Sequence, residues 1–242
     1  MAQNATAVFA SQQAEQSAIV SMMQGPLENA WALLNPDDPA TVPEFIQAVN
    51  ALTTTFGRIS GHEAAVFYSS ARTAEGITGK YTVRPAAAPD FDKVDASIRW
   101  ALKGLWTPDA PDPGTNFQNA QTLVTGVTEK NVLDTGRSTI LNASKNDRKA
   151  KGWARETEPA CCAFCAMLAT RGAVYHSEQS GDFRSHDHCR CFAIPVFNIF
   201  NVPDNVQEWQ KLYQESTQGV RGSKAMRNAF RAAYEAKYPK AL

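Results

Sequence analysis

All five cysteines and three of the four histidines of this 242-residue chain lie in one segment, residues 158–191, with the sequence EPACCAFCAMLATRGAVYHSEQSGDFRSHDHCRC. Tetrahedral zinc takes four nitrogen or sulfur donors, commonly supplied as two short-spaced pairs on two turns. Cys162 and Cys165 form a C-x2-C pair, and His186 and Cys189 form a second pair at the same spacing. We therefore predict one structural zinc ion bound by Cys162, Cys165, His186 and Cys189, which clamps the two turns into a small module.

Other donors in the same segment leave the ligand set open. Cys191 and His188 could each replace one of the four ligands, because spacing alone does not choose among the donors of HDHCRC. Cys161 is surplus, since the residue after it makes the C-x2-C pair. Two alternatives need no metal: buried thiols that pack as small apolar side chains, and a disulfide between Cys165 and Cys189 in oxidised protein.

The sequence offers no recognisable catalytic motif, and we assign no catalytic residue. A zinc deaminase needs H-x-E upstream of its cysteine pair, but Glu63 directly follows His62 here, and the H-E-x-x-H pattern of a metalloprotease fails at Val66. A cysteine nucleophile with a histidine base stays open as an alternative. The candidates for that pair are Cys162, Cys165, His176 and His188. More donors than one ion needs favour a closed structural site over an open catalytic one.

The charge balance and the apolar content of the chain indicate which partners and which cellular compartment to expect. Lys plus Arg and Asp plus Glu each number 24, so no overall field favours nucleic acid or an anionic membrane. The apolar fraction of 43% suffices for a real core. The first residues do not show the basic stretch followed by an apolar stretch that is typical of a secretory signal. No apolar run approaches the roughly 20 residues that span a bilayer. We expect no membrane partner and a reducing cytoplasm, where clustered cysteines are more often metal ligands than disulfides.

Helical periodicity dominates on both sides of the cysteine-rich segment, which predicts a mainly α fold with a small α+β zinc-knuckle-like module. Residues 1–110 form a helical N-terminal region. Its helices are expected at 4–34, 43–74 and 91–106. Gly25 and Pro26 are expected to interrupt the first helix, and Gly57 and Gly61 mark where the second would break.

Residues 115–200 combine a long helix with the cysteine and histidine module, and residues 201–242 return to helix. The long helix runs from about residue 116 to residue 150 and is polar enough to be half exposed. Two strands flank the module, GWARETE before it and CFAIPVFNIF after it, with AVY at 173–175 as a third strand-like piece. Proline-rich connectors are expected at 84–90 and 107–114.

The segment GWARETEPACCAFCAMLATRGAVY, followed by HDHCRC, resembles the Mu F-like minor head proteins of tailed bacteriophages, particularly those of phages that infect actinobacteria. The similarity covers roughly residues 149–197. The family pattern is a strand with an Arg, a C-x2-C, a small helix, a Gly and an aromatic residue, then H-x2-C-x-C before a final strand. Those positions are here Arg155, Cys162, Cys165, Gly172, Tyr175, His186, Cys189 and Cys191.

This resemblance implies a structural role in head morphogenesis. Such minor capsid proteins are encoded beside the portal, act in capsid assembly and are present in few copies inside the capsid or at its neck. The expected partners are therefore the portal and the capsid or scaffold proteins, and the expected location is the virion, after assembly in the host cytoplasm. Members from actinobacterial phages are often labelled capsid maturation proteases, so cleavage of scaffold or capsid precursor is the alternative function. A host-directed effector ejected with the DNA is a third.

Packaged DNA would be a further, local partner. Two basic runs carry cations that could contact its phosphates. They are Lys145, Arg148, Lys149 and Lys151, and Lys224, Arg227 and Arg231. The alternative is that both runs are solvated helix ends, where cations also suit the helix dipole. Neither run has interleaved aromatic residues or a recognised nucleic-acid fold, which favours the solvated alternative.

Overall fold

The computed structural model describes residues 2–106, 113–157, 161–173, 183, 185–198 and 202–239. Most of the described chain is helical, with one two-stranded antiparallel sheet, so the predicted mainly α class with a small β element is confirmed. The chain divides into two compact units, Met1–Ala143 with Phe183–Cys189, and Ser144–Asp182 with Arg190–Leu242. None of the described helices has both the length and the apolar character needed to cross a membrane.

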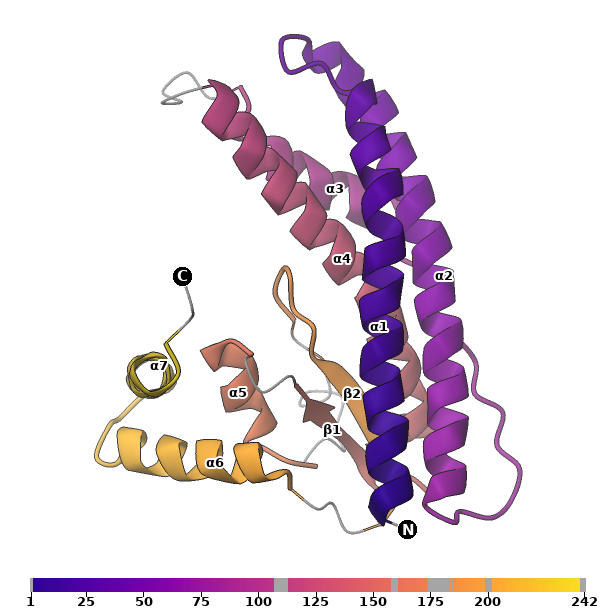
Figure 1. Ribbon diagram of the computed structural model, residues 1–242, viewed down its shortest axis with the longest axis vertical. Coiled ribbons are helices and arrows are strands. Elements are labelled where there is room, and N and C mark those ends of the chain that lie inside the picture. Colours follow the sequence, from indigo (N-terminus) through magenta and orange to yellow (C-terminus); the bar gives the residue numbers. More distant parts are fainter. Residues whose placement is uncertain are drawn as a thin grey trace. The chain divides into compact units, whose positions relative to one another are not determined.

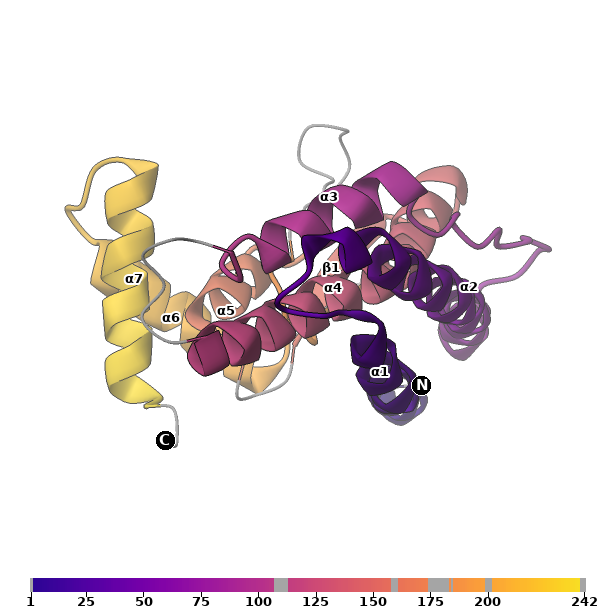
Figure 2. The ribbon, with the colours of Figure 1, turned by 90° about the horizontal axis from the view of Figure 1, so that it is seen from above.

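Helices build the first unit. They are α1 (Ala2–Ala30), α2 (Val42–Ala74), α3 (Phe91–Leu102) and most of α4 (Pro113–Asn146), with the short 3-10 turns η1 (Trp31–Leu33) and η2 (Pro39–Thr41) between α1 and α2. Figure 1 shows α1 and α2 side by side. Figure 2 views this pair close to end-on, with α3 and α4 lying across it.

One apolar core draws on all four of these helices. Trp31 contributes to it, with its ring 4.6 Å from that of Phe45 and 5.4 Å from that of Phe117, measured between ring centroids. The other buried members are Leu27, Ala30, Leu34, Val42, Ile46, Val49, Val94, Ile98, Ala101, Leu102, Ala120, Val124 and Val127. Burial of this much apolar surface makes the core the main source of stability in the unit.

The third helix is shorter than the predicted range 91–106. Its N-cap is Asp90, whose carboxylate accepts a hydrogen bond of 2.8 Å from the backbone N–H of Lys93. The helix ends at Leu102, and Leu105 just beyond it is partly buried against the same core. Its buried residues include Val94, Ile98 and Leu102.

The predicted interruption of α1 at Gly25 and Pro26 is wrong, because the helix runs through both residues. A proline removes the backbone bond to the carbonyl four residues earlier, here that of Met22. Met22 is 55% exposed and lies on the solvent side of α1, where water can satisfy the carbonyl in place of the lost N–H.

The predicted breaks of α2 at Gly57 and Gly61 are wrong as well, since the helix is continuous from Val42 to Ala74. These glycines serve close packing against α4. A β-carbon added at either would lie 3.2 Å from the side chain of Thr135, and one added at Gly136 would lie 2.6 Å from Oγ of Ser60. The absence of side chains therefore lets the two helices approach.

Burial of α4 is the largest correction to the predicted fold. The helix was expected to be half exposed, yet most residues between 124 and 140 are buried. Thr128 donates to the carbonyl of Val124 at 2.7 Å, and Thr139 donates to the carbonyl of Thr135 at 2.9 Å, so these hydroxyls need no water. The buried polar residues of its middle turns are Thr128, Glu129, Asn131, Thr135, Arg137 and Thr139.

The second unit contains the sheet and three helices. Strand β1 (Gly152–Glu156) pairs antiparallel with β2 (Phe192–Val196), with Gly152 opposite Val196, so both predicted strands are confirmed. Helices α5 (Ala163–Ala169), α6 (Asp204–Thr217) and α7 (Ser223–Lys237) share a core that includes Trp209, Phe230 and Tyr234. Figure 1 looks along α7 while α6 lies across the view, and Figure 2 shows α7 lengthwise, so the two helices cross. Residues 174–175 of the strand-like AVY piece lie outside the described residues.

Glu156 at the end of β1 gives the fold a pH dependence. Burial raises the pKa of this carboxyl to about 7, against a weaker opposing effect of the hydrogen bond with the Thr157 backbone. The folded chain therefore holds a proton that the unfolded chain releases near pH 4.5, and this group lowers stability as the pH rises from about 4.5 to about 7. Glu156→Gln should remove that slope and stabilise the protein at pH 8 by at most about 3 kcal/mol. Urea unfolding of both proteins at pH 5 and pH 8 measures the effect, and equal pH slopes would refute it.

The close approach of α2 and α4 predicts unequal effects of alanine at two helical glycines. Gly136→Ala should lower the free energy of unfolding by about 1–3 kcal/mol, because its β-carbon overlaps Ser60. Gly25→Ala is the matched control, since nothing lies within 4 Å of its β-carbon position. That control should be neutral or stabilise by up to about 1 kcal/mol. Thermal and urea unfolding decide, and a stabilising Gly136→Ala would show that the helices are not in close contact.

Candidate metal centre

Helix α5 places the C-x2-C pair. Cys162 is its N-cap, and the thiol accepts a hydrogen bond of 3.4 Å from the backbone N–H of Cys165. Cys162 is half-buried and Cys165 is buried. One turn of helix thus sets both sulfur atoms on the same side, which is the local geometry that the C-x2-C spacing predicted.

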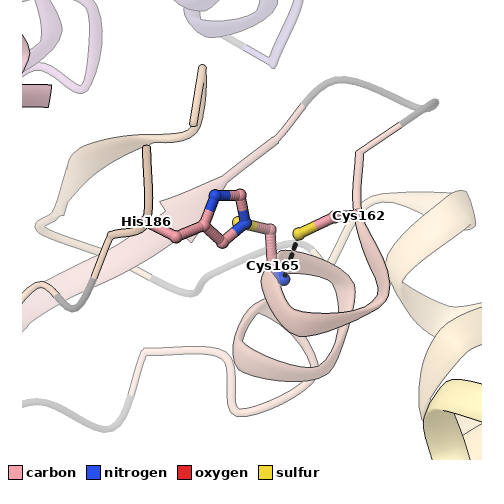
Figure 3. Close-up of side chains that lie close together, drawn as sticks. All are labelled: Cys162, Cys165 and His186. Atoms are coloured by element: carbon pink, nitrogen blue, oxygen red, sulfur yellow. Dashed lines mark hydrogen bonds between the residues drawn. The ribbon is translucent and has the colours of Figure 1, made fainter. Parts of the chain in front are cut away.

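The structure brings these thiols together with donors from the HDHCRC stretch. Among the described residues, two groups of side chains could hold a metal ion, with the ligand atoms of each group within 4.8 Å of one another. The first is Cys162, Cys165 and His186, and the second is Cys165, Cys189 and Cys191. Figure 3 shows the imidazole of His186 directed at the thiol of Cys165, with Cys162 beside it. The four predicted ligands are therefore divided between two groups that share Cys165.

Sulfur geometry suits a shared metal ion better than a disulfide. The Sγ atoms of Cys165 and Cys191 are 3.5 Å apart. Two thiolates on one tetrahedral zinc, each with a bond of about 2.3 Å, stand about 3.8 Å apart, whereas a disulfide requires about 2.05 Å. All five cysteines are free thiols. The donor set, soft sulfur with one imidazole, is the chemistry that zinc prefers.

Arg155 supplies positive charge to the cluster. Its side chain is buried, and Nη1 donates to Sγ of Cys191 at 2.7 Å. A guanidinium at this distance favours the thiolate form of a cysteine, which is the form that binds metal. The pairing of Arg155 with Ala193 across the sheet fixes the direction from which the guanidinium reaches the sulfur. Sequence analysis had given Arg155 a place in the family pattern but no role.

The two histidines of HDHC have different partners. Nδ1 of His186 is 2.8 Å from the carbonyl oxygen of Asp187, so this carbonyl can accept a proton from Nδ1, the arrangement in which a histidine binds metal through Nε2. His188 belongs to neither donor group. Its Nδ1 is 3.4 Å from the carboxylate of Glu129 and its Nε2 is 3.1 Å from the carbonyl oxygen of Thr122, both on α4.

Gly126 of α4 makes the room for His188. A β-carbon at this glycine would lie 2.7 Å from Nε2 of His188 and 2.9 Å from Cβ of Asp187. His188 has a φ of 58°, in the left-handed region that a non-glycine residue rarely adopts. Docking on α4 therefore holds the loop in a conformation that the isolated peptide would avoid.

Arg137 of α4 holds the other end of the same loop. Its guanidinium donates to the backbone carbonyl of Cys189 at 2.5 Å and to Asp134 at 2.7 Å, and Asp134 also accepts from the hydroxyl of Ser185 at 2.8 Å. Burial opposes ionisation of Asp134, but Arg137 and Lys130 outweigh it and hold the pKa of that carboxyl below its ordinary value. The ligand-bearing loop is thus anchored at both ends.

Cys161 has a structural partner outside the cluster. The hydroxyl of Tyr234 on α7 donates to the carbonyl of Cys161 at 2.8 Å and lies 3.8 Å from its sulfur. Burial raises the pKa of the Tyr234 hydroxyl, which keeps it a donor. The thiol that was surplus as a ligand therefore belongs to the packing of α5 against α7.

Comparison with known proteins shows the family of the chain. The sequence model of the VG15 protein family matches residues 3–216. The chain belongs to this family. A relative, the Gene 15 protein of Mycobacterium phage D29, is 32% identical over a region covering 57% of this chain and 66% of the relative, just under two thirds of its length. No solved structure matches. These matches support a bacteriophage origin, and neither name states a role.

Sequence reasoning missed the part that α4 plays in positioning the ligand loop. Gly126, Glu129, Asp134 and Arg137 lie on one face of the helix, at offsets of 3, 8 and 11 residues from the glycine. That spacing was a usable signal, because charged residues sharing one face with a glycine indicate a surface that receives another segment. His176, one of the two histidines considered as a base for a cysteine nucleophile, lies outside the described residues.

A side chain at Gly126 should disturb the loop that carries His186 and Cys189 without changing any proposed metal ligand. Gly126→Ala places a methyl group against His188 and Asp187. We expect metal affinity to fall about 10-fold to 100-fold, as for other residues that orient ligands without binding the metal. Competition with a chelator measures the affinity, and Gly25→Ala serves as the control. Unchanged affinity in Gly126→Ala would show that the loop is positioned by the metal alone.

Proposed function

We propose that this chain is a minor capsid protein that acts in bacteriophage head morphogenesis and carries one structural zinc ion. It docks to the portal or to the inner capsid shell during head assembly, and it stays in the virion, in the capsid interior or at the neck, after assembly in the host cytoplasm. The observation that carries the metal part is the pair of three-donor groups that share Cys165. The phage part rests on family membership and on the phage D29 relative.

A structural role for the ion follows from the size of the module. Its sheet has two strands of five residues each, and a two-stranded sheet alone is marginal in water. A tetrahedral ion that joins α5 to the chain entering β2 would supply the missing constraint, as in other small metal-dependent folds. We propose Cys162, Cys165, His186 and Cys189 as its ligands, with Cys191 able to take one of these places.

A maturation protease is the alternative, and one observation favours it. His186 stands with Cys162 and Cys165 in a group of the kind that a thiol nucleophile and its base would form. Such an enzyme would cleave scaffold or capsid precursor. The same donors cannot serve both purposes well, because a thiolate that gives a lone pair to zinc in a closed site has less electron density available to attack a carbonyl carbon. Metal content therefore separates the two functions.

Two adjacent cysteines provide a sharp test. Native mass spectrometry of the untagged chain should show one zinc per chain, retained in Cys161→Ser and lost in Cys162→Ser. Loss of a direct ligand should weaken zinc binding by more than about 100-fold, beyond the effect of residues that only orient ligands. The change is the same at neighbouring positions, so general damage by serine is controlled.

Co-expression with the neighbouring portal, scaffold and shell proteins tests the assembly role. The chain should co-purify with the portal or the shell while every partner keeps its intact mass. A partner that is shortened by the original chain, but not by a folded Cys162→Ser variant, would establish the protease instead. A folded chain that binds no zinc would rule out the structural ion.

A further inference from the structure

The surface formed by α5, α6 and α7 contains two hollows, of about 520 and about 260 Å³, that share Met167 and Arg227. We call their combined lining the α7 groove. Its remaining residues are Ala163, Phe164, Thr170, Arg171, Gln210, Tyr213, Gln214, Ser223, Met226, Asn228, Phe230 and Arg231. All of them belong to the second unit, and none is a proposed metal ligand.

Cations line this groove without counter-charges. Arg171, Arg227 and Arg231 are exposed, and none of the three forms a salt bridge with another described residue. No carboxylate is among the lining residues. Three guanidinium groups that line one groove with no acid in its lining give the groove a positive potential, which favours an anion as its ligand.

The groove also has the neutral groups that a nucleic-acid surface needs. Tyr213 and Phe164 are half-buried in its wall, where their rings can contact sugars or bases. At its other end α7 starts from Gly222, which offers no side-chain cap, so the first backbone N–H groups of the helix are left for solvent or a ligand. These aromatic residues come from α5 and α6, which is why the basic run of α7 alone looked like an ordinary solvated helix face.

The spacing of the cations selects the ligand class. Lys224, Arg227 and Arg231 follow one another at i, i+3 and i+7 along one side of α7, in steps of about 5–6 Å. A row of charges with an aromatic wall fits a polymer with regularly repeated negative charge and flat rings. An acidic peptide would match the charges but leave the aromatic wall without a partner.

We propose that the α7 groove binds DNA through its phosphate backbone, without reading its sequence. Arg227 and Arg231 contact successive phosphates, and Arg171 holds the strand from the side of α5. This function goes beyond docking in the head and does not depend on the metal ion. In this proposal the basic run of α7 is part of a binding site, whereas the other basic run, around Arg148, is a solvated surface.

Fluorescence anisotropy with a labelled DNA of about 30 nucleotides and arbitrary sequence, as single strand and as duplex, tests the proposal. Arg227→Gln with Arg231→Gln should weaken binding at least tenfold at about 0.1 M salt and reduce the slope of log K against log salt by about 2. The matched control, Arg148→Gln with Lys149→Gln, removes the same charge from exposed residues of the same unit. It should bind like the original chain. Circular dichroism confirms that both variants are folded.

Three results would overturn the proposal. The first is no binding of either DNA by the original chain at about 50 mM salt, where phosphate contacts are strong. The second is an equal loss in both double variants, which would mean that net charge and not the groove binds DNA. The third is displacement of the DNA by poly-glutamate as readily as by unlabelled DNA, which would assign the groove to an acidic peptide.

Discussion

The guanidinium of Arg137 on α4 is only 1% exposed. Its charge and its hydrogen-bond donors must therefore be satisfied by other groups of the protein, because water cannot reach them. It meets this requirement with Asp134 on its own helix and with the backbone carbonyl of Cys189. Removing the carboxylate of Asp134 would take a counter-ion away from a buried charge, which costs more than the loss of one ordinary hydrogen bond. The end of the ligand-bearing loop is therefore tied to α4 through a buried charged group.

The same requirement orders the rest of the loop. Ser185 completes the coordination of Asp134, and His188 fills the space above Gly126 while it approaches Glu129, which is 3% exposed. Among these groups water reaches the Glu129 carboxylate least, since its side chain is 4% exposed against 18% for Asp134 and 47% for His188. The backbone between them then has little freedom, which explains how a non-glycine residue is kept at positive φ. His186 and Cys189 are presented by a loop whose shape does not depend on the metal.

Sequence reasoning succeeded where a short spacing fixes geometry and failed where a distant segment decides it. The pair of Cys162 and Cys165 and the two flanking strands follow from local rules, and the structure has them. The choice between His186 and His188 does not, because it depends on Gly126 more than fifty residues away. The exposure of α4 was predicted wrongly for the same reason. A sequence rich in polar residues suggests a solvent-exposed helix unless the groups that those residues contact are known. Gly57 and Gly61 were taken as breaks because a missing side chain indicates flexibility and close packing equally well.

Loss of the metal would consequently be a partial event. The contacts of Arg137, Asp134 and Glu129 involve no sulfur donor, and the first unit has its own apolar core around Trp31. Without the proposed ion the loop would keep its contacts with α4, whereas Cys162 and Cys165 of the α5 turn would lose the constraint that the ion supplies. Unfolding would then proceed in at least two steps, and a single free energy of unfolding would describe neither.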